Sequence, residues 1–86
     1  MNLLFRPRAW EHWLFWQDTD KATVKKINAL INECLRHPFE GMGKPVPLKG
    51  DLAGLWSRRI DREHRLVYSV TKDSLEIVTC RYHHGP

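Results

Sequence analysis

The segment PFEGMGKPVPLKGDLAG, at residues 38–54, divides the chain into two parts that must fold differently. It contains three prolines and four glycines, which rules out a continuous helix or a central strand over this length. Before it, apolar residues recur at helical spacing, and after it they come in short runs separated by turn sequences. We therefore predict a long loop, with one short extended piece near 46–49. Loops of this length inside a compact domain are often functional.

The helical half begins with a short strand at 2–6, which Pro7 closes because proline lacks an N–H donor. A first helix is expected from Arg8, with Phe15 and Trp16 lying off its main apolar face. That face consists of Trp10, Trp13, Leu14 and Gln17. So many aromatic residues predict a helix that is buried on two sides, and the alternative is an exposed surface for a partner.

A second helix is predicted from a cap at Thr19 or Asp20 to about Arg36. Pro38 ends it, because the residue before a proline avoids the helical conformation. The connection between the two helices is so short that they must form an antiparallel hairpin. The inner stripe of the second helix is Val24, Ile27, Leu30, Ile31 and Cys34.

The strand half contains three runs, at 55–60, 65–70 and 75–82, joined by the short sequences DRE and TKDS, which suit hairpins. This order predicts a single α+β domain over residues 1–86. We expect an N-terminal strand and a two-helix antiparallel hairpin packed on one face of a small, mainly antiparallel sheet. The other face of the sheet would be open to a ligand.

Alternation along the strands places basic side chains on this open face. Arg59 and Arg65 flank the same tight turn, so they can approach each other across it. Lys44 and Lys49 lie in the loop beside them. Guanidinium groups suit phosphate because their forked donors match its oxygens. The alternative is a set of solvated arginines without a ligand. Ser57 and Arg59 point to one side of their strand, and Trp56, Arg58 and Ile60 point to the other.

The C-terminal sequence CRYHH adds proton carriers to this charge. Arg81 and His83 share a parity with Thr79, and His84 follows. Histidine exchanges protons near neutral pH, so a histidine beside arginines is suited to donate a proton in RNA cleavage. In that reaction a ribose 2'-hydroxyl attacks the adjacent phosphate, and no metal is needed. A metal site built from Cys80, His83, His84 and His64 is a weaker alternative, because Cys-x-x-His is only half of a motif.

The net charge and the cysteine content indicate what kind of partner and which cellular compartment to expect. The net charge of +4 favours anionic partners, either nucleic acid or an acidic protein. The two cysteines, Cys34 and Cys80, are far apart in the sequence, which predicts reduced, buried thiols in a cytoplasmic protein. We expect no cofactor and no membrane association, because no apolar run is long enough to span a bilayer.

Seven sequence blocks together resemble the YoeB-type toxins of the RelE/ParE superfamily. They are FWQDTDK at 15–21, VKKIN at 24–28, PFEGMGKP at 38–45, PLKG at 47–50, WSRRID at 56–61, EHRLVY at 63–68 and CRYHH at 80–84. The resemblance implies a RelE-like microbial RNase fold and an endoribonuclease that cuts messenger RNA in the decoding site of the ribosome. It also implies inhibition by a YefM-type antitoxin, contact with operator DNA only through the antitoxin complex, and toxin homodimers.

The resemblance also implies roles for particular residues. His83 would be the general acid and Arg65 would stabilise the phosphate, with Arg59 and Lys49 in support and Glu63 in the site. Val46 stands where the family usually has a glutamate, the proposed general base, and His84 stands where the family has a tyrosine. Either Glu63 or ribosomal groups would then replace the base. The alternative is an impaired module that binds ribosome and antitoxin, and inhibits translation or acts as a co-repressor, without cutting RNA.

Overall fold

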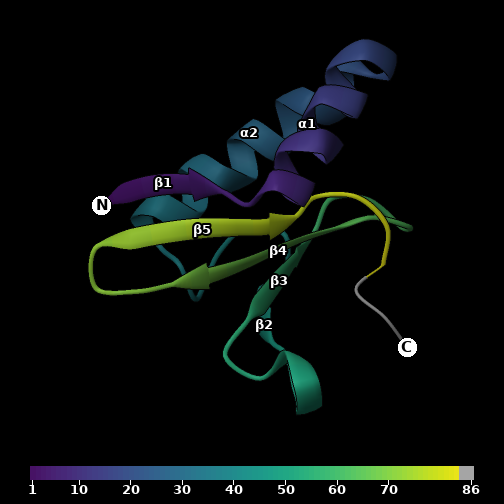
Figure 1. Cartoon of the computed structure of the whole chain (residues 1–86). Helices are drawn as coiled ribbons and strands as arrows, with labels where there is room; N and C mark the ends of the chain where they lie inside the picture. The colour runs from purple at the N-terminus through teal and green to yellow at the C-terminus, as the bar shows by residue number, and fades with distance from the viewer. Residues whose placement is uncertain (84–86) are drawn as a thin grey trace.

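The computed structural model describes residues 1–83 and has two helices on one face of a five-stranded sheet (Figure 1). This is the α+β arrangement that the sequence predicts. The strands are β1 (Asn2–Phe5), β2 (Val46–Pro47), β3 (Trp56–Arg59), β4 (Arg65–Val70) and β5 (Ser74–Thr79). The helices are α1 (Pro7–Thr19), α2 (Lys21–Arg36) and the short 3₁₀ helix η1 (Gly50–Leu52).

The strands lie in the order β1-β5-β4-β3-β2. β3, β4 and β5 form the predicted antiparallel meander, and β2 adds to its far edge. β1 pairs with β5 in parallel, from Asn2 opposite Ser74 to Phe5 opposite Ile77. The sheet is therefore mixed, with one parallel pair at the edge where the N-terminal strand joins the last strand.

One residue, Asp20, separates the two helices and explains their antiparallel arrangement. Its main-chain N–H donates to the carbonyl of Trp16 at 2.7 Å and so ends α1. Its carboxylate accepts the N–H and the hydroxyl of Thr23, at 3.2 and 2.8 Å, and so begins α2. Of the two predicted caps, Asp20 is the one that is used, and α2 ends at Arg36 as predicted.

The predicted apolar face of α1 is wrong for most of its residues, although Trp13 packs against the core. Ala9, His12 and Trp16 are the buried residues of this helix, whereas Trp10 and Leu14 are 47% and 39% exposed. Ala9 lets α1 approach β5 closely, since the thiol of Cys80 contacts the Ala9 carbonyl at 3.6 Å. Trp10 instead stacks on Trp13, with ring centroids 5.5 Å apart, on the outer surface.

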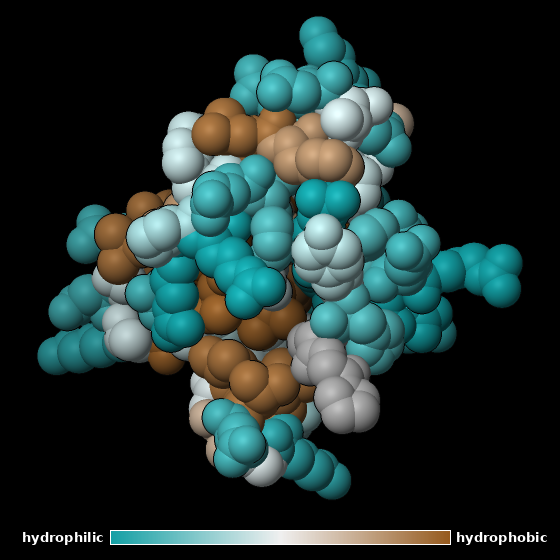
Figure 2. Space-filling view, turned by 45° about the vertical axis from the view of Figure 1, so that its right-hand side comes forward, coloured by the Kyte–Doolittle hydropathy of each residue, from teal (hydrophilic) through white to brown (hydrophobic). Residues whose placement is uncertain are grey.

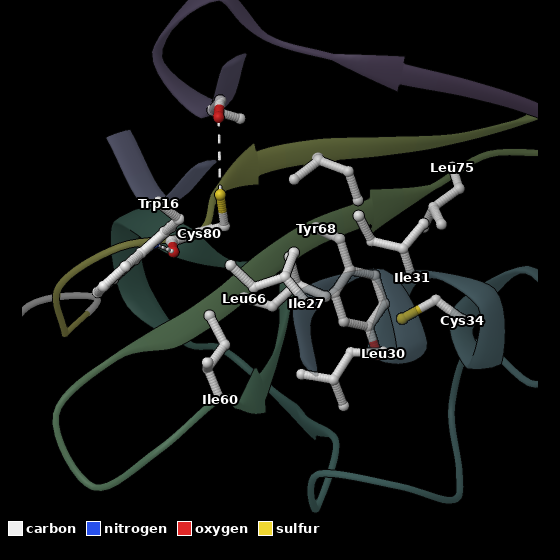
Figure 3. Close-up of a cluster of buried hydrophobic side chains, with 12 residues drawn as sticks. Trp16, Ile27, Leu30, Ile31, Cys34, Ile60, Leu66, Tyr68, Leu75 and Cys80 are labelled. Atoms are coloured by element: carbon white, nitrogen blue, oxygen red, sulfur yellow. Dashed lines mark hydrogen bonds between the residues drawn. The ribbon is translucent and has the colours of Figure 1, made fainter. Parts of the chain in front are cut away.

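The core lies between the helix hairpin and the inner face of the sheet. Figure 3 shows Leu66 and Tyr68 of β4 surrounded by side chains of α2, together with Trp16 and Cys80. Both cysteines are buried and unbonded to each other, as predicted. The members contributed by α2 are Ile27, Leu30, Ile31 and Cys34, which match the predicted inner stripe.

Arg58 is fully buried in this core, and it organises the long loop. Its guanidinium donates to the carbonyls of His37, Glu40 and Met42, with distances of 2.9 Å to the last two. Its Nε donates to the Tyr68 hydroxyl at 3.1 Å, and that hydroxyl donates to the Pro38 carbonyl at 2.7 Å. A single buried cation thus satisfies carbonyls that a loop without regular structure would leave unpaired.

Two buried acidic groups predict loss of stability in alkali. Burial raises the pKa of Tyr68 from 10.0 to about 12 and that of Cys80 from 9.0 to about 12. Because the unfolded chain ionises at the lower values, stability is full below pH 9 and is lost progressively as pH rises toward 12. A tenfold difference in proton affinity corresponds to about 1.4 kcal/mol, so the loss amounts to several kcal/mol.

Urea unfolding across this pH range measures the effect. The variant Cys80→Ala should lose less stability than the unaltered chain as pH rises from 9 toward 12, and its remaining loss comes from Tyr68 and from Cys34, whose pKa burial also raises. A midpoint that stays constant throughout the range would contradict the assignment of these two groups as the cause.

Candidate active site

A pocket of about 280 Å³ opens on the side of the sheet away from the helices, and it gathers most of the predicted cations. It brings together side chains from the loop, three strands and the C-terminal segment. Arg59 and Arg65 lie opposite each other in the pairing of β3 with β4, so their meeting across the turn is confirmed. The lining residues are Lys44, Val46, Ser57, Arg59, Arg65 and His83.

The turn between β3 and β4 holds the guanidinium of Arg65 in place. Its Nη1 donates to the carbonyls of Asp61 and His64, at 2.9 and 3.2 Å. These two bonds use only one of the three guanidinium nitrogens. The main-chain N–H of Arg65 donates to the carbonyl of Tyr82 at 3.0 Å, which ties the start of β4 to the residue before His83. This main-chain hydrogen bond holds the strand residue that carries the Arg65 guanidinium next to the segment that carries the His83 imidazole.

The loop and the short strand β2 bring Lys44 and Val46 into the pocket lining. The carbonyl of Gly43 accepts the main-chain N–H of Arg59 at 2.7 Å, and Val46 pairs with Ser57 in the β2–β3 ladder. Lys44 has a φ of 53°, a left-handed conformation that is uncommon for residues other than glycine. Such conformations cost about 1–3 kcal/mol and cluster at functional sites.

Gly43 permits this close approach, and an alanine there should disturb the pocket. A Cβ would lie 2.9 Å from Leu30 Cδ2 and 3.2 Å from the Arg59 carbonyl, at a φ of 84°. We expect Gly43→Ala to lower the free energy of unfolding by about 2–4 kcal/mol. Gly50→Ala is the matched control, because Gly50 also has a positive φ but its Cβ would meet nothing. Equal losses in urea unfolding of the two variants would show that the packing contact has no effect.

Four predicted site residues are not placed in this pocket: Arg81, which is described below, and the following three. Lys49 caps η1 and does not line the pocket. The side chain of Glu63 is 82% exposed, and its carboxylate is 4.0 Å from Nε2 of His64. His84 lies outside the described residues. Among the six side chains that line the pocket there is no carboxylate, and Val46 occupies the wall where the resemblance expects one.

Arg81 lies in a neighbouring hollow of about 200 Å³, which shares His83 with the cationic pocket. Its guanidinium lies over the rings of Phe15 and Tyr82, at 3.5 and 4.5 Å from their centroids. The floor is apolar, from Leu52, Leu55, Val67 and Val78, and Arg8 and Arg81 also line it. Figure 2 turns the C-terminal side of the molecule forward and shows apolar surface bordered by hydrophilic side chains.

Metal and membrane alternatives gain no support from residues 1–83. No group of three or more histidine, cysteine or acidic side chains there is arranged to hold a metal ion, and Cys80 is buried behind α1. Within the same residues, no helix has both the length and the apolar character needed to cross a bilayer.

Arg58 is the residue whose importance to the site the sequence reasoning missed. It holds the loop that carries Lys44 and Val46, through bonds to three loop carbonyls. The sequence did contain a signal, because Arg58 is two residues from both Trp56 and Ile60 and therefore lies on the same face of the strand, which packs on the core. A charged residue predicted on the core face means either that the predicted strand alternation is wrong or that the residue is a buried structural cation.

Comparison with known proteins gives the family. A family model described as the YoeB-like toxin of bacterial type II toxin–antitoxin systems matches residues 5–84. Toxin YoeB of Escherichia coli K12 is 60% identical over 84 residues, which cover 98% of this chain and all of that protein. A YoeB/ParE toxin structure from Agrobacterium tumefaciens superposes with a TM-score of 0.95 at 51% identity, covering 98% of this chain and 100% of that chain.

Staphylococcus aureus YoeB has been solved as a dimer and in a heterotetrameric YoeB–YefM toxin–antitoxin complex. Both structures are 46% identical to this chain, cover 98% of each chain, and superpose with TM-scores of 0.91 and 0.90. The predicted RelE-like fold is therefore confirmed. The chain belongs to the YoeB family of toxins from bacterial type II toxin–antitoxin systems, within the RelE/ParE superfamily.

Proposed function

We propose that this protein is a ribosome-dependent endoribonuclease that cuts messenger RNA by acid–base transphosphorylation. The observation that carries the proposal is the single pocket in which Arg59, Arg65 and Lys44 surround the same space as His83. Membership of the YoeB family supports the same class of function. Guanidinium groups match the oxygens of a phosphate, and an imidazole can donate a proton to a leaving oxygen.

The reaction assigns a different task to each side chain. A ribose 2'-hydroxyl loses its proton and attacks the adjacent phosphorus, and the bond from phosphorus to the 5'-oxygen breaks. His83, protonated, gives its proton to that 5'-oxygen. Arg65 and Arg59 stabilise the negative charge that builds up on the phosphoryl oxygens, which is often the largest catalytic effect. The products are a 2',3'-cyclic phosphate and a free 5'-hydroxyl.

Among residues 1–83, no carboxylate lines the pocket to accept the proton of the 2'-hydroxyl. Val46 cannot accept a proton, and Glu63 does not line the pocket but lies exposed beside His64. A missing general base lowers the rate by about 10²–10⁴-fold. We therefore infer that the enzyme is slower than relatives with a glutamate at this position, and that ribosomal groups or the RNA supply the acceptor.

The cationic pocket also accounts for control by an antitoxin. YefM is the partner in the Staphylococcus aureus complex, and a YefM-type antitoxin is proposed here too. An acidic segment that paired with Arg59 and Arg65 would occupy the place of the phosphate. Dimerisation, as in the Staphylococcus aureus toxin, is proposed on the same basis. Arg59→Glu should weaken antitoxin binding and reduce its dependence on salt, which a titration at two salt concentrations measures.

An in vitro translation reaction tests the proposed function. We expect this chain to leave truncated message at the ribosomal decoding site, and His83→Ala to leave the message intact. His37→Ala is the control, because His37 is an exposed histidine at the end of α2. Complete message in the presence of the unaltered chain would contradict the nuclease.

The lack of a carboxylate among the residues of 1–83 that line the pocket favours a second candidate function. A cationic face that binds ribosomal RNA without cutting message would also stop translation. In the translation reaction this alternative predicts ribosomes that stall on intact message. It also predicts that His83→Ala inhibits translation as strongly as the unaltered chain.

A further inference from the structure

We propose that His64 and His12 are positioning residues for the general acid, because they hold the main chain of the segment that ends in His83. The inference rests on the proposed role of His83 in RNA cleavage. Neither histidine lines the cationic pocket, and both act through the main chain of residues 80–82. They contribute by fixing the path of the chain between the end of β5 and His83.

His64 forms the shorter of the two bonds. Its Nδ1 accepts the main-chain N–H of Tyr82 at 2.7 Å. Because Nδ1 accepts this N–H, the proton of the neutral ring lies on Nε2, which is 4.0 Å from the carboxylate of Glu63. The ring also packs edge-on against Trp16, with centroids 4.8 Å apart. The β3–β4 turn thereby fixes the residue that precedes His83.

His12 forms the second bond from the opposite side. It lies on the buried face of α1, and its Nδ1 accepts the main-chain N–H of Cys80 at 3.2 Å. Burial, and then the positive charges of Arg8 and Arg81, lower the pKa of His12 and keep the ring neutral. Only a neutral imidazole offers an acceptor nitrogen, so this environment preserves the bond.

Further contacts reinforce the same segment. The indole N–H of Trp16 donates to the Cys80 carbonyl at 2.8 Å, as Figure 3 shows beside the core. The Tyr82 carbonyl accepts from Arg65. Tyr82 has a φ of 67°, a conformation that a segment without these bonds would rarely adopt. Residues 80–82 therefore depend on these hydrogen bonds to place His83 in the pocket that Arg65 also lines.

Kinetics of the histidine variants test this role. His64→Phe keeps an aromatic ring but has no acceptor, and we expect it to lower kcat by about 10–100-fold with KM nearly unchanged. His64→Asn places an amide oxygen close to the position of Nδ1 and should restore most of that loss. The same pattern is expected for His12→Phe and His12→Asn. His37→Phe, the same change at an exposed position, should leave kcat unchanged.

Nuclear magnetic resonance gives a measurement that does not depend on cleavage. We expect a scalar coupling across the hydrogen bond between the Tyr82 main-chain nitrogen and Nδ1 of His64. In His64→Phe, the His83 ring should move relative to the Arg65 side chain, which lines the same pocket in the unaltered chain. A His64→Phe enzyme with full kcat, or a His64→Asn enzyme as slow as His64→Phe, would overturn the proposal. If the unaltered chain cuts no RNA, the proposed function fails, and a His83 ring whose position is unchanged in His64→Phe separately overturns the anchoring.

Discussion

Replacing Val46 with glutamate is expected to raise the rate of message cleavage on the ribosome by about 10²–10⁴-fold. Val46 is 47% exposed and lines the pocket with Arg65 and His83, so a carboxylate there would reach the reacting ribose without burial of an unpaired charge. The neighbouring arginines would keep it ionised, and an ionised carboxylate can accept the proton of the 2'-hydroxyl. Single-turnover cleavage of ribosome-bound message measures the change.

Two further variants separate proton transfer from shape and charge. Val46→Gln has nearly the same size as the glutamate but accepts no proton, and it should leave the rate close to that of the unaltered chain. Val46→Glu combined with His83→Ala should lose the gain, because the new base still needs an acid at the leaving oxygen. A Val46→Glu enzyme that is no faster would mean that another group already serves as the base.

Replacing Arg58 with methionine is expected to lower the free energy of unfolding by about 3–5 kcal/mol. The change removes a fully buried cation and leaves the carbonyls of His37, Glu40 and Met42 without their donor. It also removes the bond from Arg58 to the Tyr68 hydroxyl. A loss of this size is a large part of the stability of a small domain. Urea unfolding measures it.

Arg59→Met is the matched control for the stability measurement. Arg59 is the next residue in the same strand, but its side chain is exposed in the pocket. We expect this variant to unfold within about 0.5 kcal/mol of the unaltered chain and to bind phosphate less well. Equal losses for the two variants would show that Arg58 does not organise the loop.

Much of the architecture follows from local patterns in the sequence. The apolar stripe of α2 and the cap at Asp20 predicted the helix hairpin, and the alternating runs predicted the meander. The meeting of Arg59 with Arg65 followed as well, because residues that flank a tight turn must pair across it. These features depend on residues close together in the sequence, and the spacing of such residues is set by the geometry of the helix, strand or turn that contains them.

Other features depend on contacts between distant residues. The parallel pairing of β1 with β5 joins residues more than 70 positions apart, and no local pattern indicates it. The inner face of α1 was mispredicted because Ala9 and His12 carry little apolar signal, although they contact Cys80. Glu63 and Lys49 lie close to the cations in sequence but outside the pocket lining, since Glu63 lies in the β3–β4 turn and Lys49 begins η1.

The chemistry of the RNA ends is the most direct test of the central claim, that His83 and its surrounding arginines cleave RNA through the ribose 2'-hydroxyl. The message should be recovered from translating ribosomes and the nucleotides at the cut identified. The account predicts a 2',3'-cyclic phosphate on one fragment and a 5'-hydroxyl on the other, with no cut when that nucleotide carries a 2'-deoxyribose. A 5'-phosphate at the cut, or cleavage that persists at the deoxyribose, would contradict it.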